Sequence, residues 1–424
     1  RDSISNSTFL FNTFDVDYDY DNTTQQVESR QKYANFCYGG AVYSKGENSN
    51  IDGCYFVNNY GDIGGALYSS GANSIISNSY FAFNIAVSRD GGAVYHIDGD
   101  RFTLSNSTFI ANNASNAGGA VSSIASIMEY DELIENPHSR YEDCNFINNT
   151  ASLGGAIYDS GDRAGFDNLT FIFNRALSGG AIYNNGFNDN VVDCSFIANT
   201  AFGADYSNGG AIYNSGSNTK ISSSNFRNNS ADYLGGSIYH TGSNFRLNEC
   251  EFSYSNSFYG GAIYLNGHSG RVENSIFNAN SAACGGAVYN NAVNFRISDN
   301  RFTNSRANIS GGAIHNSASV LSLYNNQMFG CFAGSYGDYI YTNADISYLT
   351  VSVLNNDSVN ILDHKNTYLF ANITDNLGNP VTGGNVSFLI YNPAGDEYID
   401  VGVSSLYEGI AYIEYGQNLD LGLY

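Results

Sequence analysis

Four basic side chains occupy the same position of an internal repeat: Lys220, Arg246, Arg271 and Arg296. If the repeats stack as strands of a sheet, such residues lie about 4.8 Å apart and form a row of cations. Guanidinium groups match carboxylates with two parallel hydrogen bonds. The row is therefore a candidate groove for an anionic glycan. Ion pairing is the alternative, and the nearby carboxylates that would serve it are Glu249, Glu251, Glu273 and Asp299.

A row of tyrosines follows a Gly-Gly pair in successive repeats: Tyr43, Tyr68, Tyr95, Tyr158, Tyr183, Tyr213, Tyr239, Tyr264 and Tyr289. Where the preceding aliphatic residue points inward, strand alternation turns the tyrosine outward. An exposed aromatic stripe offers a contact surface for sugar rings or a protein partner. Stacking of tyrosine on tyrosine that only stiffens the fold is the alternative. The tyrosines from Tyr183 to Tyr289 are candidate ligand-binding residues together with the basic row.

Alternating carboxylates at Asp15, Asp17, Asp19 and Asp21 indicate a weak candidate site for Ca²⁺. The segment lacks the glycine at position six and the glutamate at position twelve of an EF-hand loop. A solvated insertion is the favoured interpretation, and no other cofactor is expected.

Catalysis would need carboxylates clustered on adjacent repeats. Four acids do share one turn position, namely Asp143, Asp193, Glu249 and Asp299, but Asn168, Ser223 and Asn274 interrupt them. The six histidines are scattered, with no metal-ligand spacing. We therefore predict that the chain is not an enzyme.

The element that must position these rows is a repeat of 25 to 27 residues with two longer copies. Its first motif is Gly-Gly-Ala/Ser-aliphatic-Tyr, beginning at Gly39, Gly64, Gly91, Gly118, Gly154, Gly179, Gly209, Gly235, Gly260, Gly285 and Gly311. Its second is an aromatic residue followed three positions later by Asn, as in Phe146/Asn149. An aliphatic or aromatic residue stands five positions before that aromatic. Three short strands per repeat predict a right-handed parallel β-helix of about 12 coils over residues 1–345.

The repeat assigns each residue type a place in such a coil. Phenylalanine and aliphatic ladders fill the interior, where each buried Phe contributes about 2–3 kcal/mol relative to exposure. The Gly pair marks a bend where a Cβ would clash with neighbouring backbone. Stacked Asn side chains at a turn satisfy backbone groups that would otherwise lose their hydrogen bonds.

The composition of the 424 residues excludes several classes of protein. With 40 acidic and 17 basic residues, the net charge of -23 argues against a nucleic-acid partner. No run of 18 apolar residues exists, so no membrane-spanning helix is expected. Only 3 prolines beside 61 Tyr and Phe residues (34 and 27) argue against a disordered chain.

The paired motifs resemble the repeats of chlamydial polymorphic outer membrane proteins. The Asn- and Tyr-rich form, as in residues 145–150 followed by 154–158, is still more similar to adhesin-like surface proteins of methanogenic archaea. The resemblance covers residues 1–341 and implies an extracellular β-helical adhesin, without identifying its ligand.

Residues 346–424 lose the repeat and are predicted to form a second domain. Alternating segments at 349–353, 368–373, 385–390 and 409–413 predict strands, with turns at 375–380 and 383–384. The segment resembles the Ig-like modules of the same archaeal adhesins. Because a sandwich of seven strands needs roughly 100 residues, we expect the module to be truncated and any anchor to lie outside this fragment.

Seven cysteines are predicted to form no disulfides. Cys54, Cys144, Cys194 and Cys250 share one interior position, and the nearest pair is two coils, about 9–10 Å, apart, beyond the 7 Å limit. Sequons make several asparagines candidates for glycosylation: Asn6, Asn22, Asn106, Asn113, Asn168, Asn228, Asn308, Asn356, Asn372 and Asn385.

Three functional hypotheses follow from the sequence. The first is an extracellular cell-surface adhesin that attaches to a host or neighbouring cell through a glycan or a surface protein. The second is a structural wall or fibre component that associates with copies of itself. The third, which we favour least, is a polysaccharide lyase or hydrolase.

Overall fold

The structure is a computed structural model that describes residues 3–12, 37–97, 101–124, 139–203, 207–318, 321–342, 346–349, 367–373, 380, 384–392 and 397–415. The described residues form strands and turns without a helix, so the prediction of an all-β chain is confirmed. The chain forms two compact units, Arg1–Asn225 and Phe226–Tyr424, and each is described by itself.

Both units contain coils of a parallel β-solenoid, which has about 11 turns in all. The predicted number of coils, about 12, was slightly too high. The handedness of the solenoid stays a prediction.

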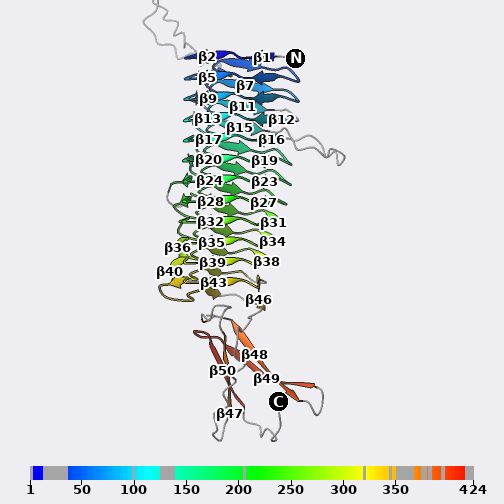
Figure 1. Ribbon diagram of the computed structural model, residues 1–424, viewed down its shortest axis with the longest axis vertical. Coiled ribbons are helices and arrows are strands. Elements are labelled where there is room, and N and C mark those ends of the chain that lie inside the picture. The colour runs from blue at the N-terminus through cyan, green and yellow to red at the C-terminus, as the bar shows by residue number, and fades with distance from the viewer. Residues whose placement is uncertain are drawn as a thin grey trace, which may run out of the picture. The chain divides into compact units, whose positions relative to one another are not determined.

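In the first unit, three parallel sheets run through the coils, and Figure 1 shows their strands stacked in chain order. The aliphatic sheet contains β1 (Ser3–Ser5), β4 (Asn50–Asp52), β8 (Ile75–Ser77), β12 (Phe102–Ser105), β16 (Ser139–Glu142), β19 (Gly165–Asp167), β23 (Asn190–Val192) and β27 (Lys220–Ser222). The phenylalanine sheet contains β2 (Thr8–Leu10), β5 (Tyr55–Val57), β9 (Tyr80–Ala82), β13 (Thr108–Ile110), β17 (Asn145–Ile147), β20 (Thr170–Ile172) and β24 (Ser195–Ile197). The tyrosine sheet contains β3 (Val42–Ser44), β7 (Leu67–Ser70), β11 (Val94–Ile97), β15 (Val121–Ile124), β18 (Ile157–Asp159), β22 (Ile182–Asn184) and β26 (Ile212–Asn214).

The second unit repeats the same three sheets. Its aliphatic sheet contains β31 (Ser243–Asn248), β34 (His268–Glu273), β38 (Val293–Ser298), β42 (Leu321–Tyr324) and β46 (Ile346–Leu349). Its phenylalanine sheet contains β28 (Asn225–Arg227), β32 (Glu251–Ser253), β35 (Ile276–Asn278), β39 (Arg301–Thr303) and β43 (Gln327–Phe329). Its tyrosine sheet contains β30 (Ile238–His240), β33 (Ile263–Leu265), β37 (Val288–Asn290), β41 (Ile314–Asn316) and β45 (Ile340–Thr342).

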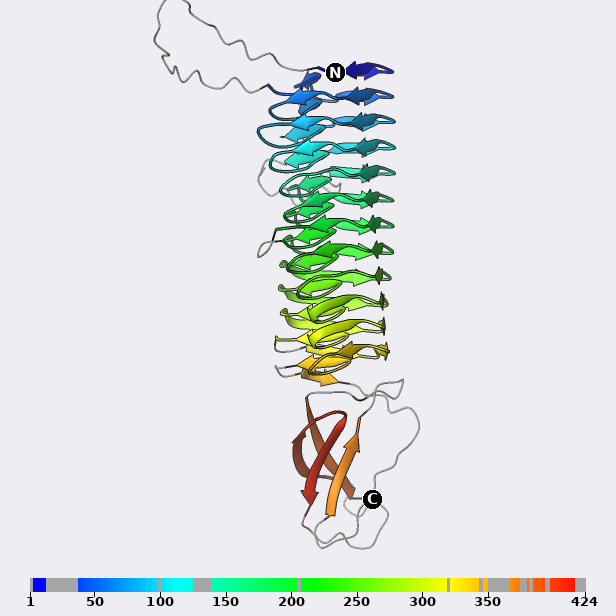
Figure 2. The same ribbon diagram turned by 90° about the vertical axis from the view of Figure 1, so that its left-hand side faces the viewer.

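A further set of strands, most of them two residues long, lies between the phenylalanine sheet and the Gly-Gly bend. Figure 2 shows the coils from a second side. In the first unit they are β6 (Tyr60–Gly61), β10 (Ile85–Ala86), β14 (Asn113–Ala114), β21 (Arg175–Ala176) and β25 (Thr200–Ala201). In the second unit they are β29 (Ser230–Ala231), β36 (Ser281–Cys284), β40 (Arg306–Ser310) and β44 (Phe332–Ala333).

The predicted phenylalanine ladder forms the interior of the solenoid. Phe56 and Phe81 stack with ring centroids 4.7 Å apart and planes at 4°, and Phe146 stacks on Phe171 at 5.0 Å. Both pairs are fully buried. The same stacking continues in the second unit, where Phe252 and Phe277 are 4.9 Å apart. Identical side chains in register thus fill the core with ring contacts at the spacing of the strands.

The predicted asparagine ladder is also present, and Nδ2 of the asparagine side chain donates to two oxygen atoms. Nδ2 of Asn84 donates to Oδ1 of Asn112 in the next coil at 2.9 Å and to the backbone oxygen of Phe56 in the previous coil at 2.9 Å. The backbone N–H of Asn84 donates to the same Oδ1 at 3.1 Å. One buried amide therefore satisfies backbone groups on both sides of the turn.

Both glycines of each Gly-Gly pair are required by the backbone. Gly154 has φ of +60°, a conformation that favours glycine. A Cβ on Gly155 would lie 2.2 Å from the carbonyl oxygen of Gly180 in the next coil. The first glycine therefore permits the bend, and the second permits close approach of two backbones.

The region after the solenoid contains two antiparallel strand pairs among its described residues. β47 (Thr367–Asn372) pairs with β50 (Ile410–Tyr415), and β48 (Asn385–Asn392) pairs with β49 (Glu397–Ser405). Three of these strands were predicted, while β49 was missed. β46 pairs in parallel with β42, so the aliphatic sheet reaches past residue 345 to Leu349. The boundary between domains and the Ig-like character of the second one stay predictions.

Candidate binding surface

The tyrosine row lies on the outer side of the tyrosine sheet. Ile182 is fully buried while Tyr183 is half-buried, and the same alternation holds for Ile263 and Tyr264. Tyr183 and Tyr213 stack with centroids 4.4 Å apart and planes at 5°. In the second unit, Tyr239 stacks on Tyr264 at 5.6 Å, Tyr264 on Tyr289 at 5.1 Å, and Tyr289 on His315 at 4.5 Å. The row predicted from the sequence therefore exists, and its rings stack on one another.

This stacking changes what the row can bind. Rings that stack face to face cover each other's faces, so a sugar ring has no free face on which to lie within the stack. The outer side presents ring edges and hydroxyl groups, which donate and accept hydrogen bonds. Burial, and after it the neighbouring phenols, raises the pKa of Tyr264, so its hydroxyl stays protonated. The row is a ladder of ring edges and hydroxyl groups rather than an aromatic platform.

Aromatic side chains before the Gly-Gly pair extend this surface in the second unit. Tyr259 contacts Tyr289 edge to face at 5.1 Å, Phe258 at 4.7 Å and Tyr233 at 5.8 Å. Phe258 is exposed, and the others are half-buried. The sequence did not single out these residues, because they occupy positions where other coils carry Leu, Ser or Asn.

Three of the four basic side chains lie side by side on the aliphatic sheet of the second unit. Arg246 is the direct strand partner of Arg271, which in turn pairs with Arg296. All three are exposed. Lys220 lies in the first unit, is exposed, and has Asn190 as a strand partner there. The predicted register of the row is thus confirmed for the three arginines.

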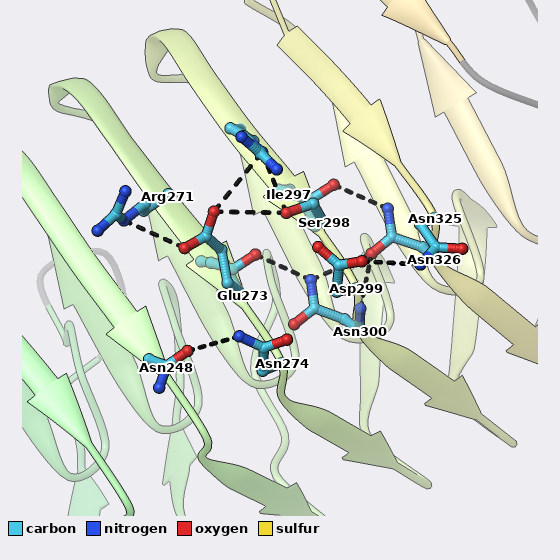
Figure 3. A network of polar contacts seen from close by, with 12 residues as sticks. Asn248, Arg271, Glu273, Asn274, Ile297, Ser298, Asp299, Asn300, Asn325 and Asn326 are labelled. Carbon is cyan, nitrogen blue, oxygen red and sulfur yellow. Dashed lines mark hydrogen bonds and ion pairs between the residues drawn. The ribbon is translucent and has the colours of Figure 1, made fainter.

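Glu273 bridges two of these arginines. Its Oε2 lies 3.1 Å from Nε of Arg271, and its Oε1 lies 3.5 Å from Nε of Arg296. Figure 3 shows Glu273 between Arg271 and Ser298, whose hydroxyl accepts a hydrogen bond from Arg296 at 3.1 Å. Of the carboxylates that the sequence offered for ion pairing, Glu273 thus pairs with the arginines of the row. One carboxylate balances two guanidinium groups, and the three arginines together keep an excess of positive charge.

The acids at the shared turn position do not form a catalytic cluster. Asp143 and Asp193 are exposed and have positive φ of 52°, like the asparagines that replace them in other coils. Asn168, between them, donates from Nδ2 to Oδ1 of Asp143 at 2.7 Å. Among the described residues, no group of three or more His, Cys, Asp or Glu side chains has a geometry that could hold a metal ion. Asp15, Asp17, Asp19 and Asp21 lie outside the described residues.

The cysteines share a role with serines of other coils. Cys194 donates from Sγ to the backbone oxygen of Val192 at 3.2 Å, as Ser224 donates from its hydroxyl to Ser222 at 2.8 Å. Most coils thus have a small buried donor at this position, and Leu169 replaces it in one coil, whereas the sequence had suggested only a small apolar side chain. All seven cysteines are described and none is in a disulfide; their state in the isolated protein stays a prediction.

The sequons differ in how accessible their side chains are. Asn6, Asn106, Asn113, Asn168, Asn228, Asn308 and Asn385 are exposed. Asn106 and Asn168 donate from Nδ2 to Asn78 and Asp143 in the preceding coils, at 2.6 and 2.7 Å. A glycan on either would replace such a bond. The side chain of Asn372 is not described, and Asn22 and Asn356 lie outside the described residues.

These features define the class as an all-β repeat protein built as a parallel β-solenoid. Residues 143–160 and 193–215 match the family profile of the Chlamydia polymorphic membrane protein repeat. Both segments begin at the exposed acid of the turn and include the Phe, Asn and Gly-Gly ladders. No helix in the described part of the chain is long and apolar enough to cross a membrane.

Comparison with solved structures finds viral proteins. ORF18 of Geobacillus virus E2 is similar over 81% of this chain and 70% of its own, with 14% identity and a TM-score of 0.41. The tailspike receptor binding domain of Siphovirus 9NA is similar over 98% of this chain and 85% of its own, with 10% identity and a TM-score of 0.28. No curated protein sequence matches the chain significantly.

Proposed function

We propose that the chain is an extracellular, cell-surface adhesin that attaches to a host or neighbouring cell, through a glycan or a surface protein, by the outer side of its solenoid. The observation that carries the proposal is the polymorphic membrane protein repeat at residues 143–160 and 193–215, whose family name indicates a surface or outer-membrane protein. In this proposal the chain acts by binding, without a catalytic step or a cofactor. Its archaeal origin and an Ig-like spacer after the solenoid belong to the same proposal.

The arginine row of the second unit is the proposed contact for an acidic ligand. Arg246, Arg271 and Arg296 lie in adjacent strands, and Glu273 offsets part of their charge. Guanidinium groups bind carboxylates or sulfates through charge-assisted hydrogen bonds. On a chain with a net charge of -23, such a local excess of positive charge is the place where an anionic glycan meets the least repulsion.

Binding of the purified chain to a glycan array and to whole cells tests the proposal. We expect binding to acidic glycans that falls at least tenfold in Arg246→Ala/Arg271→Ala. The matched control is Arg301→Ala/Arg306→Ala, which removes two exposed arginines of the same unit from other strands. Absence of binding to every cell and glycan would contradict the adhesin. Release of reducing ends would instead identify a hydrolase or lyase, and filament formation a structural component.

A further inference from the structure

The phenylalanine sheet of the first unit has an outer face without a charged side chain. In β2, β5, β9, β13, β17, β20 and β24 the central phenylalanine points inward, so the two flanking residues point outward. The second flanking residue is apolar in every strand: Leu10, Val57, Ala82, Ile110, Ile147, Ile172 and Ile197. The first is Thr, Tyr, Asn or Ser. Seven consecutive strands of a very acidic chain thus carry an uncharged apolar row, which we call the isoleucine face. Leu10 is exposed, Ala82 is buried, and the other five side chains are partly exposed.

The same sheet in the second unit has a different outer face. Its flanking residues include Arg227, Glu251 and Arg301, all exposed. The interior ladder is the same in both units, since Phe252 stacks on Phe277 as Phe146 stacks on Phe171. The fold therefore does not require an apolar outer face, and the isoleucine face is a feature of the first unit alone.

Exposed phenylalanines in a strained conformation border the isoleucine face. Phe11, Phe83 and Phe173 directly follow its strands with φ of 53°, 56° and 56°, and they are 69%, 51% and 57% exposed. A left-handed backbone is unfavourable for a bulky residue, and asparagine adopts it more readily. Asn58 and Asn148 occupy the equivalent turns of other coils with φ of 55°. Phenylalanine at these turns costs stability, and more than half of each side chain stays exposed to solvent, which points to contact with a partner.

A second copy of the chain is the partner that the charge and size of the face fit. Two copies, each with a net charge of -23, repel one another wherever carboxylates would meet, and the isoleucine face avoids this. Seven strands about 4.8 Å apart and roughly five residues wide give a face of about 500 Å². Two such faces bury about 1,000 Å², which is the lower limit of a specific interface. The resulting dimer should form at micromolar concentrations.

Charges at the two rims of the face select a parallel arrangement. Asp143 and Asp193 are exposed at the turns before the strands, and Arg175 is exposed beyond the turn after them. In a dimer whose two-fold axis is parallel to the stack of coils, the strands of the two copies run in opposite directions. The rim where the strands begin in one copy therefore faces the rim where the strands end in the other. The coil that contains Arg175 lies between the coils that contain Asp143 and Asp193. Arg175 of one copy therefore lies opposite the two aspartates of the other copy, at a height between them. An antiparallel pair would instead place the acidic rims together.

We propose that the isoleucine face is the interface of a parallel homodimer, in which two solenoids lie side by side and point the same way. Two sheets packed face to face in this way are about 10 Å apart, as in a β-sandwich. The proposal is independent of any ligand of the arginine row, since that row lies on the aliphatic sheet of the second unit. A failure of the dimer would leave the adhesin untouched.

Sedimentation equilibrium of the whole chain, over a wide range of concentration, tests the proposal. We expect a monomer–dimer equilibrium that becomes monomeric in Ile147→Glu/Ile172→Glu with an unchanged circular dichroism spectrum. Ile75→Glu is the matched control, because Ile75 also points outward from a strand of the first unit but lies on the aliphatic sheet. A wild-type chain that stays monomeric at every concentration, or a dimer that survives the double substitution, would overturn the interface.

Three further variants keep the test decisive if the glutamates impair folding. Phe83→Asn/Phe173→Asn should weaken the dimer at least tenfold while raising the melting temperature, because asparagine suits the left-handed turn. If the phenylalanines had only a structural role, the substitutions would lower both the affinity of the dimer and the melting temperature. Arg175→Glu should weaken the dimer, and adding Asp143→Arg/Asp193→Arg should restore it. Restoration supports the parallel arrangement, and a failure to restore overturns it.

Discussion

The hydroxyl of Tyr141 donates a hydrogen bond of 2.6 Å to Oδ2 of Asp159, and both side chains are fully buried inside the solenoid. The backbone N–H of Gly161 donates to Oδ1 of the same carboxyl at 2.7 Å. Burial raises the pKa of Asp159 from 3.8 to about 7 despite these donors. In the next coil Asn184 occupies the same strand position, so the fold places a neutral amide there as well.

The buried carboxyl predicts that the chain is more stable at pH 5 than at pH 8. A raised pKa means that the folded state holds the proton more tightly than the unfolded state. This stabilisation is complete below the unfolded pKa of about 4 and is lost as the pH rises to about 7, the folded value. Burial raises the pKa of Asp189 to about 7 as well, so both groups act in the same direction. Thermal melts across this window measure the slope.

Asp159→Asn should remove part of the slope and raise the melting temperature at pH 8, because the amide carries no charge to bury. The hydroxyl of Tyr141 can accept as well as donate, so it can adapt to the amide. Asp193→Asn is a control, because that acid is exposed. An equal effect of the two substitutions would mean that general charge repulsion, rather than the buried site, sets the pH dependence.

Gly155→Ala should destabilise the solenoid by about 2–4 kcal/mol, the range of severe steric substitutions. The added Cβ would lie 2.2 Å from the carbonyl oxygen of Gly180 and 2.6 Å from the backbone of Arg175, and neither can move without breaking the coil. Gly165→Ala is the matched control, since a Cβ there meets nothing within 4 Å. Chemical denaturation of both variants measures the difference, and similar unfolding free energies would contradict the steric argument.

Cys194→Ser should leave stability within about 1 kcal/mol, whereas Cys194→Val should cost more. Valine removes the hydrogen bond from Sγ to the backbone oxygen of Val192, which then keeps only the bond from the N–H of Asn168. Ser224 already makes the equivalent hydrogen bond in the first unit. Burial raises the pKa of the Cys194 thiol to about 12, so it should resist alkylation in the folded chain. Alkylation in denaturant should label all seven cysteines. Fewer labels in denaturant would contradict the prediction that no disulfide forms.

The interior of the solenoid was predictable from the sequence, and most of its outer surface was not. Phe146, Asn149 and the Gly154 pair recur because each has one steric or hydrogen-bonding role that few residues can fill. Outward positions vary between coils, so a pattern there is visible only once the register is known. The isoleucine face was overlooked for this reason. The stacking of Tyr264 on Tyr289, which hides the ring faces, likewise depends on side-chain orientation that spacing alone does not give.

Glu273→Gln should strengthen the binding of an acidic oligosaccharide while changing stability by less than about 1 kcal/mol. The substitution removes the carboxylate that holds Nε of Arg271 and Arg296 at 3.1 and 3.5 Å. Both arginines are exposed at the surface, and surface ion pairs contribute only about 0.2–1 kcal/mol. Both guanidinium groups then become available to the ligand. Glu251→Gln is the matched control, because it removes an equal charge from an exposed position on the phenylalanine sheet. Titration of each variant with a carboxylated oligosaccharide, at two salt concentrations, measures the change in affinity. Tighter binding in Glu273→Gln alone supports the arginine row as the binding site. An equal gain in affinity in Glu273→Gln and Glu251→Gln would mean that only the net charge of the chain matters.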